Sequence, residues 1–409
     1  MNFWHEYALP LSQTSKPVKA AIYALGGAHK SFKLQDQAEG TSRSLAHSYE
    51  LASVQQYNNA IRIIHEYMSS PEKNFQVILT CCLIFICTES LYGRYENVSR
   101  HLEAAFSLLS TRDRWNDLGT ECHGETGARG KHGDLARFME NICPSLCSLA
   151  SDLFFYVGDN HSPKLVSQLT KWVEMQDPIN LEDPGTPFTS AQEAASSLTR
   201  IESMCDVELY TECPTCLAEG CCGNASLVCR HINNELDAEP YYHHWNARFN
   251  AFRNSFDPSK VSDLELYRFK ILELEEATWA ATLKLEDSDD DLETSDCINM
   301  LQKAESIIQF LKTDKGQTFT FQANLVPPIA YVIISCQDAK IQWKGVELLR
   351  SLGRREGVWD SKKMADIYAE MITAKENRLL TWEDIPADVP QLTELLGSLQ
   401  LSTPLTNLQ

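Results

Sequence analysis

The sequence has no excess of basic charge. Its 409 residues include 36 lysines and arginines against 56 aspartates and glutamates, which gives a formal net charge of −20 at pH 7. A chain this acidic is repelled by phosphate backbones unless it carries a strong local basic patch. The basic pairs Arg354-Arg355 and Lys362-Lys363 are too small for a DNA footprint or a nuclear import patch. Composition therefore argues against unaided binding to DNA or to an anionic membrane.

Long apolar runs are also missing. The longest run, Phe75 to Cys87, is interrupted by Gln76 and Thr80, and its thirteen residues are too few to span a bilayer. Its length suits a buried core helix. The first residues, Met1 to Glu6, have neither the basic start nor the apolar run of a secretory signal. We therefore expect an intracellular protein.

Cysteine is abundant, with 14 residues. Without a secretory signal, disulfides are not expected. Several cysteines fall inside apolar helical runs, where a reduced thiol packs as a small hydrophobic group. These are Cys81, Cys82, Cys87 and Cys336.

The alternation of apolar and polar residues that marks a half-buried strand is scarce. Apolar residues instead recur every three or four positions, which is typical of helices. The pattern predicts an all-α fold of stacked antiparallel helical hairpins, similar to an α-solenoid. The segment 75–92 is apolar almost all round and predicts a central buried helix containing Leu83, Phe85 and Ile86. One-sided helical stripes lie within 54–68, 98–109, 301–311 and 346–352, and in the aromatic series Trp245, Phe249, Phe252 and Phe256.

Four segments break this pattern, and three of them are read as loops or linkers. The Gly-rich, polar segment 116–134 and the Pro-rich segment 177–187 predict loops. Residues 286–296 form an acidic run, which is read as a solvated linker or as a contact for a basic partner. Residues 211–230 hold five cysteines. The small residues Gly26-Gly27-Ala28 indicate tight packing or the end of a helix.

That cysteine-rich segment contains the one cluster with metal-like spacing. Thiolates of a CxxC pair can share a tetrahedral zinc ion with two further ligands. The second half of the cluster lacks a CxxC, so an exposed loop of reduced thiols is preferred to a zinc site. The candidate ligands are Cys213, Cys216, Cys221, Cys222, Cys229 and His231.

Five blocks of residues follow one another in a fixed order along nearly the whole chain. They are Phe3-Trp4 with 17–25, 56–61 with 83–102, 188–194, 245–249, and 326–339 with 354–360. Together they resemble the fungal-specific transcription factor domain, the regulatory region of fungal binuclear-zinc-cluster transcription factors. The order of the blocks carries the resemblance more than any single block does.

This resemblance implies a single regulatory domain over 1–380, with halves at 1–176 and 188–380, and a C-terminal tail at 381–409. It implies a non-enzymatic transcription regulator in the nucleus, or also in the cytoplasm, that acts on a metabolic, secondary-metabolite gene cluster. Family members usually carry a zinc-cluster DNA-binding module, for which we expect no room before Phe3. The expected partner is therefore a protein, either a DNA-binding transcription factor or a co-activator, with no direct nucleic acid and no membrane.

Two other readings stay open at this stage. The chain is also compatible with a small-molecule-binding protein or an enzyme that reuses the helical scaffold, and with a fragment of a longer activator. Neither catalytic residues nor a cofactor are expected, while a homodimer and a small-molecule effector stay open. A pocket with converging polar or titratable residues would favour the small-molecule reading, and no spacing in the sequence reveals one.

Overall fold

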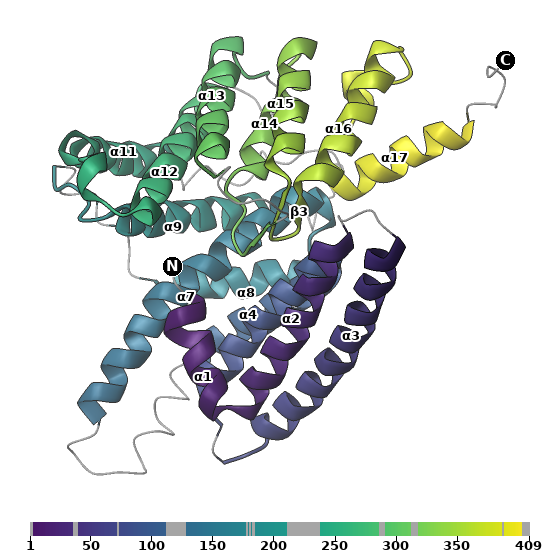
Figure 1. Ribbon diagram of the computed structural model, residues 1–409. Coiled ribbons are helices and arrows are strands. Elements are labelled where there is room, and N and C mark those ends of the chain that lie inside the picture. The colour runs from purple at the N-terminus through teal and green to yellow at the C-terminus, as the bar shows by residue number, and fades with distance from the viewer. Residues whose placement is uncertain are drawn as a thin grey trace, which may run out of the picture.

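The computed structural model describes residues 3–35, 40–71, 73–111, 128–176, 179, 181, 185–210, 238–285, 291–311, 318–386 and 388–402. Helices dominate these residues, and the strands found among them are three short ones, so the predicted all-α class is confirmed. The helices form an N-terminal layer and a C-terminal layer, and α7 reaches from one to the other (Figure 1).

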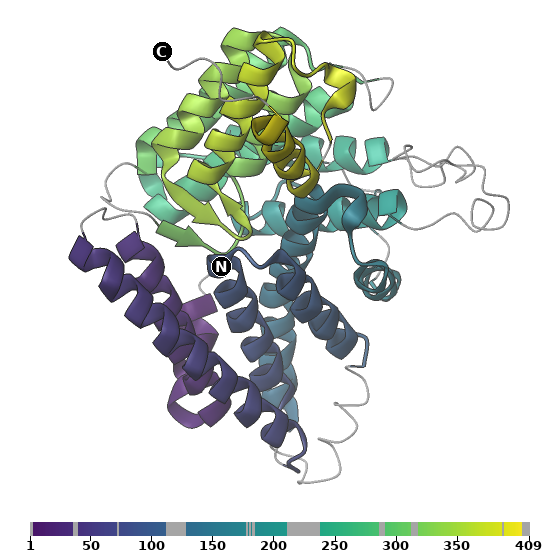
Figure 2. The ribbon, with the colours of Figure 1, turned by 90° about the vertical axis from the view of Figure 1, so that its right-hand side faces the viewer.

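The N-terminal layer is built from the first part of the chain and is drawn in purple and blue in Figures 1 and 2. Its central helix is α4, which packs mainly against α2 and α5 and touches α3 and α7 only slightly. The elements are η1 Trp4–Ala8, α1 Leu9–Thr14, α2 Lys16–Gln35, α3 Gly40–Met68, α4 Phe75–Tyr92, α5 Tyr95–Leu109, α7 Ala128–Val157, η2 Gly158–Asn160 and α8 Pro163–Glu174.

Helix α4 has the bounds and the burial that its composition predicts. The side chain of Asn74 accepts hydrogen bonds from the amides of Gln76 (2.8 Å) and Val77 (3.4 Å), which caps the helix start. Gly93 ends the helix with φ of 69°, a left-handed conformation that favours glycine. Between these ends, every residue except Gln76 and Tyr92 is buried. By length and composition α4 could cross a membrane, yet 89% of it is buried inside the protein, as in the core helix of a soluble protein.

The helices at the start of this layer do not pack in the order in which they follow one another along the chain. Helix α2 packs between α3 and α4, so that α3 and α4 touch only slightly. The close approach of α2 to α3 depends on Gly27, where an added Cβ would lie 2.9 Å from Cβ of Ser53. Helix α2 continues through this glycine, so tight packing, and not a helix end, explains the small residues there.

The C-terminal layer runs in colour from teal at α9 through green to yellow, with α13 to α16 side by side (Figure 1). These helices confirm the predicted helical stripes at 301–311 and 346–352. The elements are α9 Ala191–Tyr210, α11 Ala238–Ser255, η3 Pro258–Lys260, α12 Asp263–Thr282, α13 Thr294–Leu311, α14 Val326–Ser335, α15 Ala339–Leu352, α16 Ser361–Glu376, η4 Trp382–Asp384 and α17 Val389–Ser402, with strands β1 Thr318–Thr320, β2 Arg354–Glu356 and β3 Trp359–Asp360.

The small sheet lies between the two layers (Figure 2). Strand β2 pairs parallel with β1, with Phe319 opposite Arg355, and antiparallel with β3. The basic pair Arg354-Arg355 is buried in this strand. Arg355 donates a hydrogen bond of 3.1 Å to the carbonyl of Leu91, near the C-terminal end of α4, where a cation is favoured. Arg355 thus connects the sheet to the N-terminal layer.

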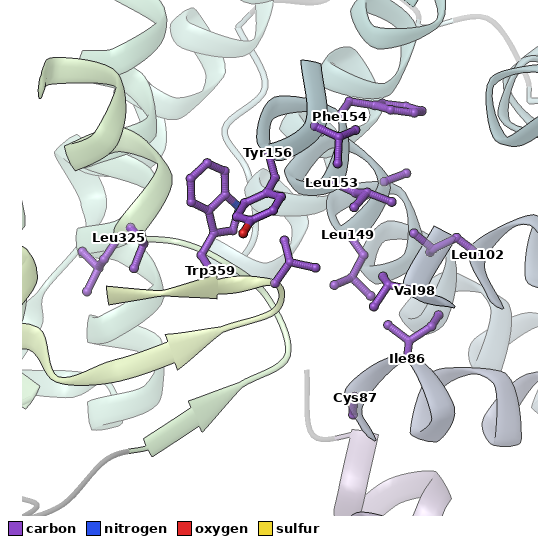
Figure 3. Packing of buried hydrophobic residues seen from close by; sticks show 14 of the residues in the cluster. Ile86, Cys87, Val98, Leu102, Leu149, Leu153, Phe154, Tyr156, Leu325 and Trp359 are labelled. Carbon is purple, nitrogen blue, oxygen red and sulfur yellow. The ribbon is translucent and has the colours of Figure 1, made fainter. Parts of the chain in front are cut away.

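One hydrophobic core runs through both layers, from Phe3 to Leu396. At its centre the ring of Trp359 on β3 meets the ring of Tyr156 on α7 edge to face, with centroids 5.0 Å apart (Figure 3). A second cluster surrounds the aromatic series on α11, where Trp245, Phe249 and Phe252 are buried, as predicted for a core stripe. The division of the chain into domains stays a prediction.

Two of the expected breaks have a different outcome. Helix α7 already begins at Ala128, so the predicted loop 116–134 is wrong for 128–134, while 112–127 lie outside the described residues. A helix that forms downstream can extend through a glycine at a cost of only about 1 kcal/mol. Helix α13 likewise begins at Thr294, inside the acidic run, and Asp296 lies 2.7 Å from Lys284.

Candidate functional site

A partly open cavity of about 1250 Å³ lies inside the protein. Its walls come from α7, α9, α12, the end of α13, β1 with the residues after it, and the start of α14. Trp4, from the first helical turn of the chain, also lines it. The volume exceeds the roughly 300–1,000 Å³ of typical small-molecule sites. It is therefore large enough for an organic ligand.

Helices α7, α9 and α12 each present one face to the cavity. On α9 the lining residues Gln192, Ser196, Thr199, Glu202 and Asp206 are spaced by three or four, so they share one face of the helix. The same spacing places Ser148, Asp152 and Phe155 of α7, and Tyr267, Ile271 and Glu275 of α12, on the faces toward the cavity.

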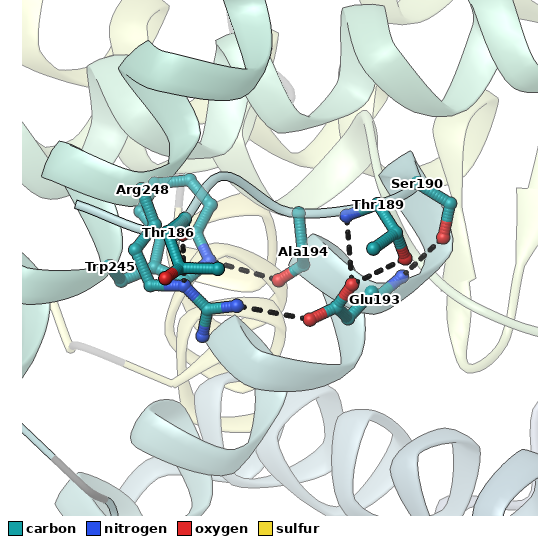
Figure 4. A network of polar contacts seen from close by, with 7 residues as sticks. All are labelled: Thr186, Thr189, Ser190, Glu193, Ala194, Trp245 and Arg248. Atoms are coloured by element: carbon teal, nitrogen blue, oxygen red, sulfur yellow. Dashed lines mark hydrogen bonds and ion pairs between the residues drawn. The ribbon is translucent and has the colours of Figure 1, made fainter. Parts of the chain in front are cut away.

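The start of α9 is held in place by a network of polar contacts (Figure 4). Glu193 accepts hydrogen bonds from the amide (2.8 Å) and the hydroxyl (2.7 Å) of Thr189, while its own amide donates to the hydroxyl of Ser190 (3.2 Å). This reciprocal pattern satisfies amides at the helix start. Arg248 and Trp245 of α11 bind the same turn, through Glu193 (3.0 Å) and the carbonyl of Ala194 (2.9 Å).

Helix α12 is fixed to α9 at the same end. The hydroxyl of Ser262 caps α12 by accepting from the amide of Glu265 (3.3 Å). The carboxylate of Glu265 in turn accepts a hydrogen bond of 2.7 Å from the amide of Ala191, the first residue of α9. The two polar helix faces are thereby held in a defined relation across the cavity.

Four carboxyl groups converge on the cavity from these three helices: Asp152, Glu202, Asp206 and Glu275. Asp152 accepts a hydrogen bond of 3.2 Å from the amide of Ala323, and Glu202 accepts one of 3.3 Å from the indole of Trp279. Asp206 accepts a hydrogen bond from the hydroxyl of Ser151. For Glu275 the described residues provide neither a hydrogen bond nor an ion pair.

The carboxyls have unusual acidities because the protein surrounds them. Burial raises the pKa of Asp206 to about 7, the hydrogen bond from Ser151 opposes this rise, and the Glu202 carboxyl adds to it. Burial also raises the pKa of Glu202. For Asp152 and Glu275 burial moves the pKa well above the ordinary carboxyl range, and the other acids of the group contribute. Such groups cluster at functional sites, although ion-pair networks also produce them.

The opposite wall, at the sheet, is built around the buried residue Glu356. One oxygen of its carboxylate accepts hydrogen bonds from the amides of Asn324 (2.9 Å), Leu325 (2.8 Å) and Val326 (3.0 Å), at the start of α14. Its other oxygen lies 3.1 Å from Nε of Arg354, which lines the cavity. Glu356 therefore fixes the shape of this wall and is the ion-pair partner of Arg354.

The described residues that line this cavity include none of the sequence-predicted candidates. The six zinc candidates from Cys213 to His231 lie outside the described residues. Within the described part of the chain, no three His, Cys, Asp or Glu side chains are arranged to hold a metal ion. The aromatic series on α11 packs into the second core and is absent from the cavity lining.

The cavity carboxyls are missed by the sequence analysis, although one signal for them exists. Helix α9 carries a polar series at helical spacing, Gln192, Ser196, Thr199, Glu202 and Asp206, opposite the buried residues Ala194, Leu198 and Ile201. Alone, that pattern describes any solvated helix face. Only the packing of α7 and α12 across it turns the polar face into a cavity wall.

Comparison with known proteins gives one match. Residues 1–143 match the family model described as fungal specific transcription factor domain. The resemblance stated from the sequence is thereby confirmed over this segment, and the match supports a role in the regulation of transcription. No curated protein and no solved structure matches the chain.

The matched segment and the cavity lie in largely different parts of the chain. The match ends at Cys143, and every lining residue except Trp4 comes from Pro144 onward. The two parts meet where the ring of Phe3 stacks on Phe321, with centroids 6.2 Å apart, beside Trp4. The cavity is therefore a feature of this structure that the family match does not describe.

Proposed function

We propose that this chain is a nuclear transcription regulator and that a small molecule bound in the cavity sets its activity. The family match supports the regulatory role. The observation that carries the effector site is the convergence of four carboxyl groups on one cavity of about 1250 Å³. This is the feature by which a small-molecule reading is distinguished from a purely structural domain.

The output is contact with another protein, either a DNA-binding transcription factor or a co-activator. The formal net charge of −20 supports this route, because an acidic surface does not favour DNA. A ligand would act by bridging α7, α9 and α12 with the start of α14, and so by shifting the chain toward the arrangement that it binds best. The proposed targets are the genes of a metabolic cluster.

An enzyme that reuses the scaffold is the second candidate, favoured by the same carboxyls. A carboxyl whose pKa is near 7, as for Asp206, is suited to general acid–base catalysis. The two functions differ in the fate of the ligand. A sensor releases it unchanged, whereas an enzyme converts it, so mass spectrometry of ligand recovered after incubation with the protein separates them.

The experiment for the regulator fills the cavity and measures transcripts. Ser148 lines the cavity on α7, so Ser148→Phe reduces the space for a ligand. The matched control is Ser44→Phe, which places the same side chain on the exposed face of α3. Transcripts are compared among host strains with the native chain, each variant or no chain.

We expect the strain without the chain to lose expression of a defined gene set. Ser148→Phe should lock that set in one state at normal protein abundance, while Ser44→Phe should behave as the native chain does. An unchanged transcript profile in the strain without the chain would overturn the regulatory role. A native response of the Ser148→Phe strain would overturn the effector site.

A further inference from the structure

We propose that the cavity binds an organic cation, an amine or guanidine group carried on an aromatic or aliphatic body. This inference rests on the proposed function, in which the cavity is the effector site. It depends on the charges that line the cavity, on their partners and on the walls around them.

The first step is the charge balance of the lining. Five carboxyl residues line the cavity: the four that converge from α7, α9 and α12, and Asp263. The basic residues among the described lining residues are Arg268 and Arg354. Both have acids of their own, because Arg268 lies 3.7 Å from Glu265 and Arg354 lies 3.1 Å from Glu356. The lining thus has more carboxyl groups than basic groups, and both of its arginines pair with acids outside the lining.

The second step is the carboxyl of Glu275. It is partly buried and lines the cavity from α12. It forms neither a hydrogen bond nor an ion pair with the other described residues, although polar groups inside proteins are normally satisfied. A donor delivered by a ligand would supply the missing partner, and a charged donor makes the strongest such bond.

The third step excludes a bare metal ion. In the described part of the chain the carboxyls are not grouped closely enough for three of them to share one ion. A metal would also leave most of the cavity empty. The cavity therefore suits an organic ligand, with its charged group at the carboxyls and its uncharged part in the remaining space.

The fourth step is the apolar wall. Phe155, Tyr267, Trp279 and Tyr331 all line the cavity, and the rings of Phe155 and Tyr331 meet edge to face at 6.3 Å. Aromatic faces attract cations as well as apolar groups. The wall therefore accepts the body of the ligand, and the carboxyls accept its positive end.

The test is a binding screen on the full chain with matched triplets of probes. Each triplet shares one body and differs in its polar group, as in tryptamine, tryptophol and indole acetic acid, with further triplets on phenyl, naphthyl and cyclohexyl bodies. Thermal shift identifies the binders, and calorimetry measures their affinities. We expect the amines to bind and to exceed their alcohols and acids by about ten-fold or more.

Variants then locate the binding. Glu275→Gln keeps the shape of the side chain but cannot form the carboxylate that a bound cation would stabilise, so it should weaken amine binding by about ten-fold while the alcohols are unaffected. Glu347→Gln on the exposed face of α15 is the matched control and should change nothing. Melting curves show that both variants are folded.

The outcomes separate the two proposals. Equal or better binding of alcohols or acids, no binder among the amines, or full amine affinity in Glu275→Gln would each overturn the cation site, whatever the Ser148→Phe strain shows. Amine binding combined with a native transcript response in the Ser148→Phe strain would retain the cation site and overturn its role as an effector site.

Discussion

Helix α4 and the cavity wall formed by α9 and α12 differ in what they place inside the protein: α4 buries mainly apolar side chains, whereas the wall turns carboxyl groups inward. Helix α4 is surrounded by neighbours, and even its polar residues Thr80, Thr88, Glu89 and Ser90 are buried. Helix α9 instead turns a polar face inward, where Glu202 and Asp206 meet acids from two other helices. The first helix contributes burial of apolar surface to stability. The second places costly groups inside the protein.

The contrast teaches where stability and binding are separated in this chain. Enclosed carboxyls with raised pKa values weaken the folded state at neutral pH, because ionising them there costs free energy. Cavities and strained polar groups are typical of sites kept for function at the expense of stability. Burial of apolar surface in the N-terminal layer and the continuous core offsets the destabilisation caused by the enclosed carboxyls.

The largest expected effect removes the buried charge that shapes the cavity wall. Glu356→Ala leaves three amides at the start of α14 without their acceptor and leaves Arg354 buried without its acid. Removing one partner of a buried ion pair costs about 3–5 kcal/mol. Urea unfolding should show this loss. Glu356→Gln keeps one acceptor oxygen and should cost less, so equal losses in the two variants would contradict this account.

The next effect tests the apolar side of the comparison. Leu83 in α4 is fully buried, with 0% exposure. Leu83→Ala should lower the free energy of unfolding by about 2–5 kcal/mol through lost burial and the space left behind. Leu51, which is 53% exposed on α3, is the matched control. Leu51→Ala should stay within about 0.5 kcal/mol of the native chain. Similar losses at both sites would mean that α4 is not the centre of the core.

These two sites also show how far sequence reasoning reaches. The bounds and burial of α4 follow from an apolar run between Asn74 and Gly93, which are local signals of helix start and end. The hydrophobic stripes of α5, α13 and α15 follow in the same way, since periodicity reports which face is buried. The all-α class could therefore be predicted from the residues alone.

The parts that were missed depend on contacts between distant residues. Strand β2 is only three residues long and is held by β1, which precedes it by more than thirty positions, so no local pattern marks it. The placement of α2 between α3 and α4 rests on one close approach at Gly27. The cavity likewise needs three helices to meet, whereas each polar face alone reads as exposed to water.

A third prediction concerns pH and the enclosed acids. Burial raises the pKa of Asp206 from 3.8 to about 7 in the folded protein. A carboxyl whose pKa is higher in the folded than in the unfolded protein contributes stability that is fully present at pH values below the unfolded pKa. This contribution is lost as the pH rises through the folded pKa of about 7. Asn cannot ionise and can still accept the hydrogen bond from Ser151. Asp206→Asn should therefore gain about 2–4 kcal/mol over the native chain at pH 8 relative to pH 4.

The measurement is urea unfolding of both chains at pH values from 4 to 8. Because Glu202 and the other acids are present in both proteins, the difference between the curves reports Asp206 together with its interaction with Glu202. Asp263→Asn, at an exposed position of the cavity lining, is the matched control. A constant difference for Asp206→Asn across this range would mean that the carboxyl is hydrated in the folded protein.

The smallest effect distinguishes two adjacent glycines in α2. At Gly27 an added Cβ would lie 2.9 Å from Cβ of Ser53 and 3.3 Å from the carbonyl oxygen of Tyr49, so α2 and α3 must move apart. At Gly26 an added Cβ meets nothing within 4 Å. Alanine stabilises a helix interior over glycine by about 0.5–1 kcal/mol, whereas overpacking costs about 1–3 kcal/mol.

The two substitutions should consequently have opposite signs. Gly26→Ala should raise the melting temperature slightly, and Gly27→Ala should lower it, because the displaced atoms of α3 include backbone that cannot rotate away. The shift should stay within the N-terminal layer and leave amine binding in the cavity unchanged, since neither glycine lines it. A stabilising Gly27→Ala would show that α2 and α3 pack less closely than described. A loss of amine binding would show that the two layers are coupled more tightly than their shared core implies.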